Sequence, residues 1–141
     1  MTDSDSIGQY VTDTHALIWH FTRDKRLSNE ALRHFAAADQ GDAVIYVSAM
    51  TLIEIVYLGE KARVSQTLCD EVIHLLKPSK DSSYRITPID HAVSTAVARV
   101  PRSAVPEMPD RVIAATAYHL RLPLITKDQR IHDWKGITSV W

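Results

Sequence analysis

The chain has very little cysteine, little glycine and no long apolar run. Its single cysteine, Cys69, cannot form an internal disulfide in a chain of 141 residues, which suits a reducing compartment, so we expect the cytoplasm. No run reaches the roughly 18 apolar residues that a membrane-spanning helix requires, so we expect no membrane partner. The beginning, MTDSDSIGQ, is acidic and polar, unlike the basic-then-apolar layout of a signal peptide.

The chain also lacks an excess of charge of either sign. Its formal net charge is -1, which excludes a nucleic-acid binder driven by global positive charge but not one with a local basic stripe. With 45% hydrophobic residues, the chain is long enough for one domain with a core and too short for two. We expect residues 1–8 to form a loose tail and residues 9–141 to form a single domain.

Short stretches rich in β-forming residues alternate with longer stretches of helical character. This alternation predicts an α/β three-layer sandwich, in which helices flank a central, mostly parallel sheet. The expected strands cover residues 9–12, 44–47, 84–89, 124–126 and 137–141. The expected helices cover residues 15–21, 29–38, 49–60, 66–77, 91–99 and 111–120, and Ser28, Ser65, Asp90 and Asp110 precede four of them as candidate N-caps.

Four carboxylates lie far apart in the sequence but at or near the ends of expected elements. Asp13 directly follows the first strand, and Asp128 lies two residues beyond Thr126 at the end of another. Asp110 opens the last of the expected helices. Glu54 borders the apolar face of its helix instead of standing opposite it. Because ligands of open α/β sheets bind at the carboxyl ends of the strands, we expect these acids to converge there.

Convergent acids of this kind predict a metal site. Clustered carboxylates raise one another's pKa and are costly to keep ionised without a compensating cation. Hard oxygen ligands, with no Cys or His at ligand spacing, favour Mg²⁺ or Mn²⁺ over zinc. Such an ion makes a bound water more acidic and offsets charge in the transition state, so the chemistry predicted is phosphodiester hydrolysis. The expected catalytic and metal-binding residues are Asp13, Glu54, Asp110 and Asp128.

Some of these residues also have an ordinary structural explanation, whereas Glu54 favours function because a charged residue is seldom placed against an apolar helix face without a partner. Asp110 can simply cap a helix and Asp13 can be a turn residue at a strand end, whereas Asp90, in a similar place, is assigned to capping. Thr126 suits a strand by its β-branching, or its hydroxyl orients a carboxylate or a water at the metal. Arg111 can pair with an acid, contact a phosphate or lie in solvent.

Four segments together carry a family resemblance: VTDTHALIW, SAMTLIEI, PDRVIAATA and LPLITKD. They occur in the order and spacing of the PIN-domain ribonucleases, and the chain most resembles the VapC-type toxins of toxin–antitoxin pairs, from residue 9 to the C-terminus. The resemblance implies a PIN-like fold and a Mg²⁺- or Mn²⁺-dependent endoribonuclease. The acids of that family match Asp13, Glu54, Asp110 and Asp128, and Thr126 stands at the position of a supporting hydroxyl.

The resemblance also implies partners, and it has one departure. Its members cleave RNA, tend to form homodimers and are inhibited by a small antitoxin protein that inserts a peptide into the active-site groove. Many of them carry a further acid in the pattern D-P-x-D-R, where this chain has Glu107 and a displaced Pro109. Large apolar residues near the expected groove can anchor a partner or belong to the core: Trp19, Phe21, Leu27 and Tyr57.

The sequence fits other metal-dependent or aspartate-based enzymes less well than a nuclease. A haloacid-dehalogenase-like phosphatase needs a second Asp two residues after the first, where this chain has His15. A phosphoryl-aspartate receiver needs acids close together at its first strand, and only Asp13 is present there. A catalytically silent PIN-like domain that binds RNA or protein is the remaining alternative, although such a site is expected to lose one or more of its acids. Metal-dependent RNA cleavage separates it from the nuclease.

Overall fold

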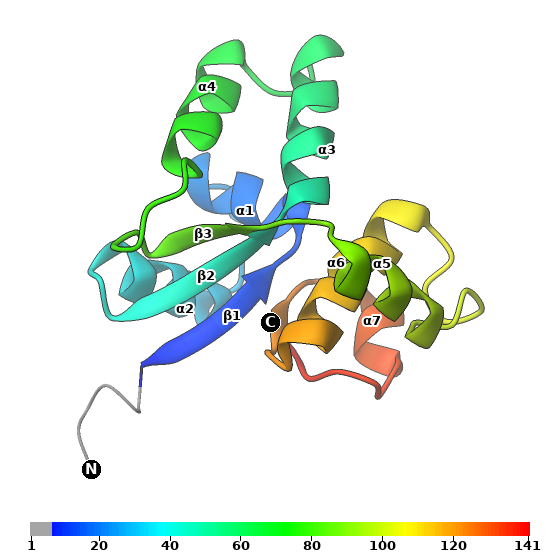
Figure 1. The fold of residues 1–141 in the computed structure, drawn as a ribbon. Helices are drawn as coiled ribbons and strands as arrows, with labels where there is room; N and C mark the ends of the chain where they lie inside the picture. The colour runs from blue at the N-terminus through cyan, green and yellow to red at the C-terminus, as the bar shows by residue number, and fades with distance from the viewer. Residues whose placement is uncertain (1–6) are drawn as a thin grey trace.

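The computed structural model describes residues 7–141 and shows three layers, with helices on both sides of a sheet (Figure 1). The five strands are all parallel and are ordered β3-β2-β1-β4-β5. The predicted three-layer α/β class is therefore confirmed. The strands are β1 (Gly8–Thr12), β2 (Ala43–Ser48), β3 (Tyr84–Thr87), β4 (Leu124–Ile125) and β5 (Ser139–Val140). The helices are α1 (Thr14–Phe21), α2 (Asn29–Asp39), α3 (Ala49–Glu60), α4 (Gln66–Leu75), α5 (His91–Ala96), the 3₁₀ turn η2 (Val97–Arg99), α6 (Met108–Leu120) and α7 (Gln129–Asp133).

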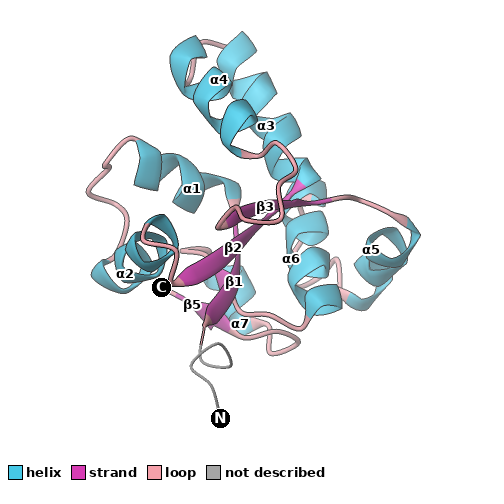
Figure 2. Cartoon of the chain, turned by 60° about the vertical axis from the view of Figure 1, so that its left-hand side comes forward, coloured by secondary structure: helices cyan, strands magenta, loops and turns pink. Residues whose placement is uncertain are grey.

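An apolar core lies between the sheet and the helices on each of its two faces. On one side, Ile45 and Val47 of β2 pack with Phe35 of α2 and with the buried residues of α1, α3 and α4. On the other side, Val11 of β1 and Leu124 of β4 pack with the buried face of α6 and with residues of α5 and α7. Figure 2 shows the sheet between α1 and α2 on one side and α5, α6 and α7 on the other. Helices therefore cover both faces of the sheet, as is usual for a parallel sheet.

The ends of several elements differ from the prediction. The first strand begins at Gly8, so the expected tail of residues 1–8 is wrong by at least that residue, and residues 1–6 lie outside the described part. The third strand ends at Thr87, two residues before the predicted end at residue 89. The last strand has only two residues. Helix α7 was missed because five residues are too few for an apolar period to be recognised.

The predicted helix caps are mostly confirmed. The side chains of Ser28, Ser65 and Asp90 each accept a hydrogen bond from a backbone N–H in the first turn of the helix that follows. Asp110 is a correction: α6 begins at Met108, and Asp110 lies inside its first turn. Pro109 fits there because a first-turn N–H has no partner within the helix, so the missing N–H of proline costs nothing.

The order of the strands defines where a ligand site is expected. Strand β1 lies between β2 and β4, so the connections that leave the carboxyl ends of β1 and β4 diverge to opposite sides. In open α/β sheets, such a switch point forms the crevice in which ligands bind. Asp13 follows β1 and Thr126 follows β4, and the backbone N–H of Asp13 donates to Ile125 O at 3.1 Å.

In the described residues, no helix is long and apolar enough to cross a membrane.

Candidate active site

Asp13 combines a structural role with a position in the crevice. As the N-cap of α1, its Oδ1 accepts a hydrogen bond from the backbone N–H of Ala16 at 2.8 Å. Its Oδ2 accepts a hydrogen bond from the hydroxyl of Thr126 at 2.6 Å. Both oxygens are thus oriented by fixed donors, one from α1 and one from the end of β4. Asp13 can therefore cap α1 and still present its carboxylate to a ligand in the crevice.

Thr126 links Asp13 to Asp128. Its side chain is fully buried, and its hydroxyl oxygen accepts a hydrogen bond from the backbone N–H of Asp128 at 3.0 Å. Asp128 is itself the N-cap of α7, and its Oδ1 accepts from the N–H of Arg130 at 2.9 Å. The hydroxyl of Thr126 therefore connects the turn between β4 and α7 to the carboxylate of Asp13. A residue chosen only because its β-branching suits a strand would not need this hydroxyl.

Glu54 reaches the same region from α3. Its Oε1 accepts a hydrogen bond from the hydroxyl of Thr14 at 2.6 Å, and the hydroxyls of Thr14 and Thr51 lie 3.0 Å apart. Both threonines are buried, so this network fixes α1 against α3 beside Asp13. The sequence interpretation missed Thr14 and Thr51. A hydroxyl residue directly after Asp13 was the available signal, but threonine at a helix start is common enough to be overlooked.

The pKa of Asp110 is raised by burial and by the charges of the other three acids. Burial raises this pKa from 3.8, and the negative charges of Asp128, Glu54 and Asp13 raise it further, in that order, to about 6, while His15 opposes them. The pKa of Asp13 is also raised, mainly by burial and to a smaller extent by Asp128, against the hydrogen bonds from Thr126 and Ala16. Three acids from other segments therefore make the ionisation of Asp110 less favourable.

The donor chemistry of this cluster suits a hard divalent cation. All four groups offer carboxylate oxygens, and a positive charge among them would offset the repulsion that raises the pKa of Asp110. Across residues 7–141, no three His, Cys, Asp or Glu side chains lie in an arrangement that could hold a metal ion together. Mg²⁺ is usually held by only one or two carboxylates and completes its coordination with waters. Asp13 and Asp110 are the candidates for direct ligands.

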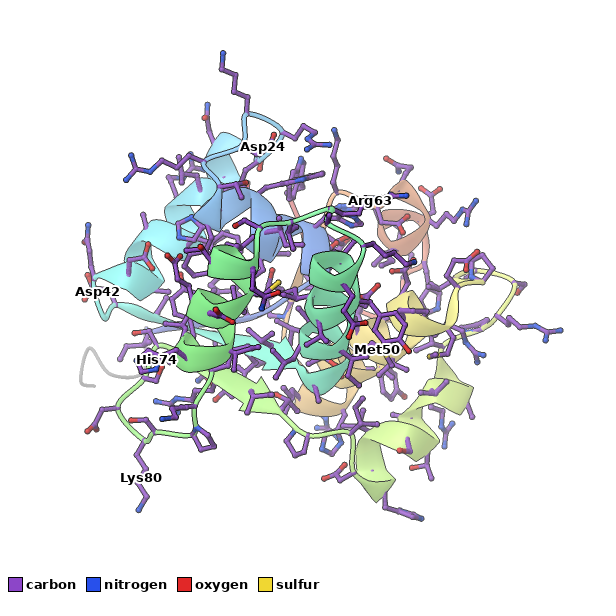
Figure 3. All side chains as sticks on the ribbon, turned by 90° about the horizontal axis from the view of Figure 1, so that it is seen from above. Asp24, Asp42, Met50, Arg63, His74 and Lys80 are labelled. Atoms are coloured by element: carbon purple, nitrogen blue, oxygen red, sulfur yellow. The ribbon has the colours of Figure 1, made fainter. Side chains whose placement is uncertain are left out.

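A groove of about 530 Å³ opens beside Glu54. Its walls include His15 of α1, Tyr57 of α3 and Met108 of α6, and Tyr57 and Met108 are about 60% exposed. Figure 3 shows Met50 near the start of α3 and Arg63 in the turn that joins α3 to α4. Of the four large apolar residues considered as partner anchors, Trp19, Phe21 and Leu27 pack against the core, and Tyr57 projects into solvent.

Basic and aromatic side chains adjoin the acids on the side of α1. The guanidinium of Arg26 lies 4.7 Å from the ring centroid of Trp19, and the ammonium of Lys127 lies 5.8 Å from it. Arg26 also forms an ion pair with Asp24 at 2.7 Å. Because Lys127 stands between Thr126 and Asp128 in the sequence, this cluster reaches the edge of the candidate site.

Arg111 does not face the acids. Its Nη2 donates to the carbonyls of Val97 and Val100 at 3.0 and 2.9 Å, and its Nε also donates to Val100. Val97 is the first residue of the 3₁₀ turn η2 and Val100 directly follows it, so the guanidinium joins that turn to α6. Glu107, the acid that departs from the family pattern, is exposed at the start of α6 and makes no side-chain capping bond.

Replacing Arg111 with Met is expected to lower stability more than RNA affinity. The two carbonyls lose their donors, which costs about 1–3 kcal/mol in the free energy of unfolding measured by urea denaturation. Arg102→Met, at an exposed position, is the control and should change stability little. A loss of RNA affinity at unchanged stability would instead assign the guanidinium of Arg111 to a phosphate contact.

Comparison with known proteins identifies the class to which this fold and site belong. The family model described as PIN domain matches residues 10–136, so the chain belongs to the PIN-domain family. It is 29% identical over 133 residues to Ribonuclease VapC22 of Mycobacterium tuberculosis, a match that covers 93% of this chain and 97% of the relative.

Solved structures share the fold. The DNA-bound VapBC structure from Salmonella typhimurium aligns with a TM-score of 0.66 at 18% identity, covering 94% of this chain and 97% of the other. A toxin–antitoxin complex from Klebsiella pneumoniae aligns with a TM-score of 0.62 at 21% identity, covering 94% and 96%. At these identities the structures support the PIN-like three-layer architecture, which agrees with the all-parallel sheet.

Proposed function

We propose that this protein is a metal-dependent endoribonuclease and the toxin of a toxin–antitoxin pair. Residues 8–141 form its nuclease domain, and Mg²⁺ or Mn²⁺ is its cofactor. The single observation that carries the proposal is the hydrogen-bonded arrangement at the carboxyl ends of β1 and β4, where the hydroxyls of Thr126 and Thr14 hold the carboxylates of Asp13 and Glu54. The likeness to Ribonuclease VapC22 over nearly the whole chain supports the ribonuclease activity.

The four acids have separate roles in this proposal. Asp13 and Asp110 bind the principal ion, and Asp128 and Glu54 complete its surroundings or contribute to a second ion. Thr126 and the Ala16 N–H keep the carboxylate of Asp13 in one orientation, and Thr14 does the same for Glu54. When bound, the ion would make an attacking water more acidic and offset the negative charge that develops on the phosphate.

The experiment that tests the proposal is cleavage of pooled, structured cellular RNAs by the purified, antitoxin-free protein. Incubation with Mg²⁺ or Mn²⁺ is expected to give defined RNA ends, and EDTA is expected to abolish them. Mapping the ends identifies the substrate. If a folded preparation binds RNA but leaves it intact with either metal, the protein is instead a silent PIN-like binding domain.

The partner side of the proposal rests on the comparisons. Solved neighbours of this fold include a toxin–antitoxin complex and VapBC structures. We propose that a small antitoxin binds this chain and inhibits it, that the chain forms a homodimer and that it acts in the cytoplasm. The adjacent gene is expected to encode a short protein that copurifies with this chain and suppresses its nuclease activity. Absence of both complex formation and toxicity on expression would contradict the toxin role and leave the nuclease untouched.

A further inference from the structure

His132, in α7, bridges the ends of β4 and β5. Its Nε2 lies 2.6 Å from the backbone carbonyl oxygen of Thr126, and its Nδ1 lies 2.7 Å from the hydroxyl of Ser139. Its own backbone N–H donates to Asp128 O at 3.1 Å, within α7. The imidazole therefore lies directly behind the turn that carries Thr126 and Asp128, and both ring nitrogens are engaged.

The Thr126 carbonyl fixes the direction of one hydrogen bond, and the tautomer of a neutral ring then sets the other. A carbonyl oxygen has no proton to give, so Nε2 must carry the hydrogen and donate it to Thr126. In the neutral imidazole, Nδ1 is then the acceptor, and the hydroxyl of Ser139 donates to it. The ring is thus oriented from β5 by Ser139 and acts on β4 through Thr126.

Every polar atom of Thr126 has a partner. Its N–H donates to Val140 O at 3.1 Å, and its carbonyl accepts from His132. Its hydroxyl donates to Asp13 and accepts from the N–H of Asp128. Since the side chain is fully buried and its backbone is held at both ends, the hydroxyl has one direction in which to point, toward the carboxylate of Asp13.

We propose that His132 is a positioning residue of the active site: it holds Thr126 in place and, through the Thr126 hydroxyl, fixes the metal-binding orientation of Asp13. This inference rests on the proposed function. Groups that orient the ligands of a metal typically affect metal affinity or activity by about 10–100-fold when removed. The chain Ser139–His132–Thr126–Asp13 has this form, running from the sheet edge to the carboxylate.

The test compares direct Mn²⁺ binding, measured from the electron paramagnetic resonance signal of free Mn²⁺, with RNA cleavage kinetics. His132→Ala is expected to weaken Mn²⁺ binding by about 10-fold and to lower kcat by about 10–100-fold, with KM for RNA unchanged. His132→Gln, whose amide N–H can donate to the Thr126 carbonyl, is expected to restore most of both. In a Thr126→Val background, His132→Ala should have little further effect, because the link to Asp13 is already broken.

A matched control separates positioning from general stability. Tyr84→Phe removes a 2.6 Å hydrogen bond to Asp39 from the opposite end of the sheet, where β3 begins, and it should lower the melting temperature without changing Mn²⁺ affinity. If His132→Ala behaves like Tyr84→Phe, with full Mn²⁺ affinity and kcat, the positioning role is wrong. If Gln fails to restore the Mn²⁺ affinity of a folded protein, donation to Thr126 is not the cause. If the unsubstituted protein neither binds Mn²⁺ nor cuts RNA, the proposed function fails and this inference with it.

Discussion

Asp13→Asn is expected to abolish metal-dependent RNA cleavage while leaving the fold intact. Asn replaces one carboxylate oxygen with an amide nitrogen and removes the charge that attracts the ion. Because substitutions that only misorient a ligand already cost about 10–100-fold, loss of a ligand should lower kcat by more than about 100-fold. Asn is as good an N-cap as Asp, and its oxygen can still accept from Ala16, so α1 should remain formed. RNA cleavage and circular dichroism measure the two effects.

Asp90→Asn is the matched control for Asp13→Asn. Asp90 also follows a strand and also caps a helix, since its Oδ1 accepts from the N–H of Val93 at 3.0 Å. It does not contribute to the raised pKa of Asp110. Full activity in Asp90→Asn and none in Asp13→Asn would show that capping is not the reason for the loss. Wild-type cleavage by Asp13→Asn would exclude Asp13 from the metal site.

Asp110→Asn is expected to remove activity and, without metal, to raise stability at neutral pH. The pKa of Asp110 rises from 3.8 to about 6 on folding, so ionisation is less favourable in the folded state than in the unfolded state. Its carboxylate therefore lowers the free energy of unfolding progressively as the pH rises from about 4 to about 6, and fully above that window. The neutral amide avoids this cost. A melting temperature a few degrees above wild type is expected at pH 7, with little difference near pH 4.

Two further measurements make the Asp110 prediction specific. Asp42→Asn, at an exposed position, should show no such dependence on pH. Addition of Mg²⁺ should raise the melting temperature of wild type more than that of Asp110→Asn, because the cation offsets the repulsion and binds the folded state. A variant that is less stable than wild type at pH 7, or whose advantage is the same at pH 4, would contradict the electrostatic account of the four acids.

The features predicted best from sequence have short-range causes. Helix α3 (Ala49–Glu60) has the predicted ends, and the caps at Ser28, Ser65 and Asp90 were recognisable because capping depends on the identity of one residue. The convergence of the four acids was also predictable, since parallel strands place their carboxyl ends at one edge. The pKa of Asp110 supports this convergence. The roles of these acids remain a prediction.

What the sequence did not predict depends on contacts between distant segments. Glu54 and Thr14 are 40 residues apart and Thr126 and Asp13 are 113 apart, and no local pattern reveals such hydrogen bonds. Arg111 was open to pairing with an acid, contacting a phosphate or lying in solvent, yet its guanidinium donates to the carbonyls of Val97 and Val100. The start of α6 was misplaced because Asp110 satisfies the residue preference of a cap while Glu107 occupies that position.

The most direct test of the central claim is a crystal structure of the protein grown with Mn²⁺, with an anomalous difference map collected for manganese. We expect an anomalous peak bonded to the carboxylates of Asp13 and Asp110, with Asp128 and Glu54 beside it, and no such peak in Asp13→Asn. A map from a well-occupied, folded crystal with no peak among these four acids, or with manganese bound only elsewhere, would contradict the account.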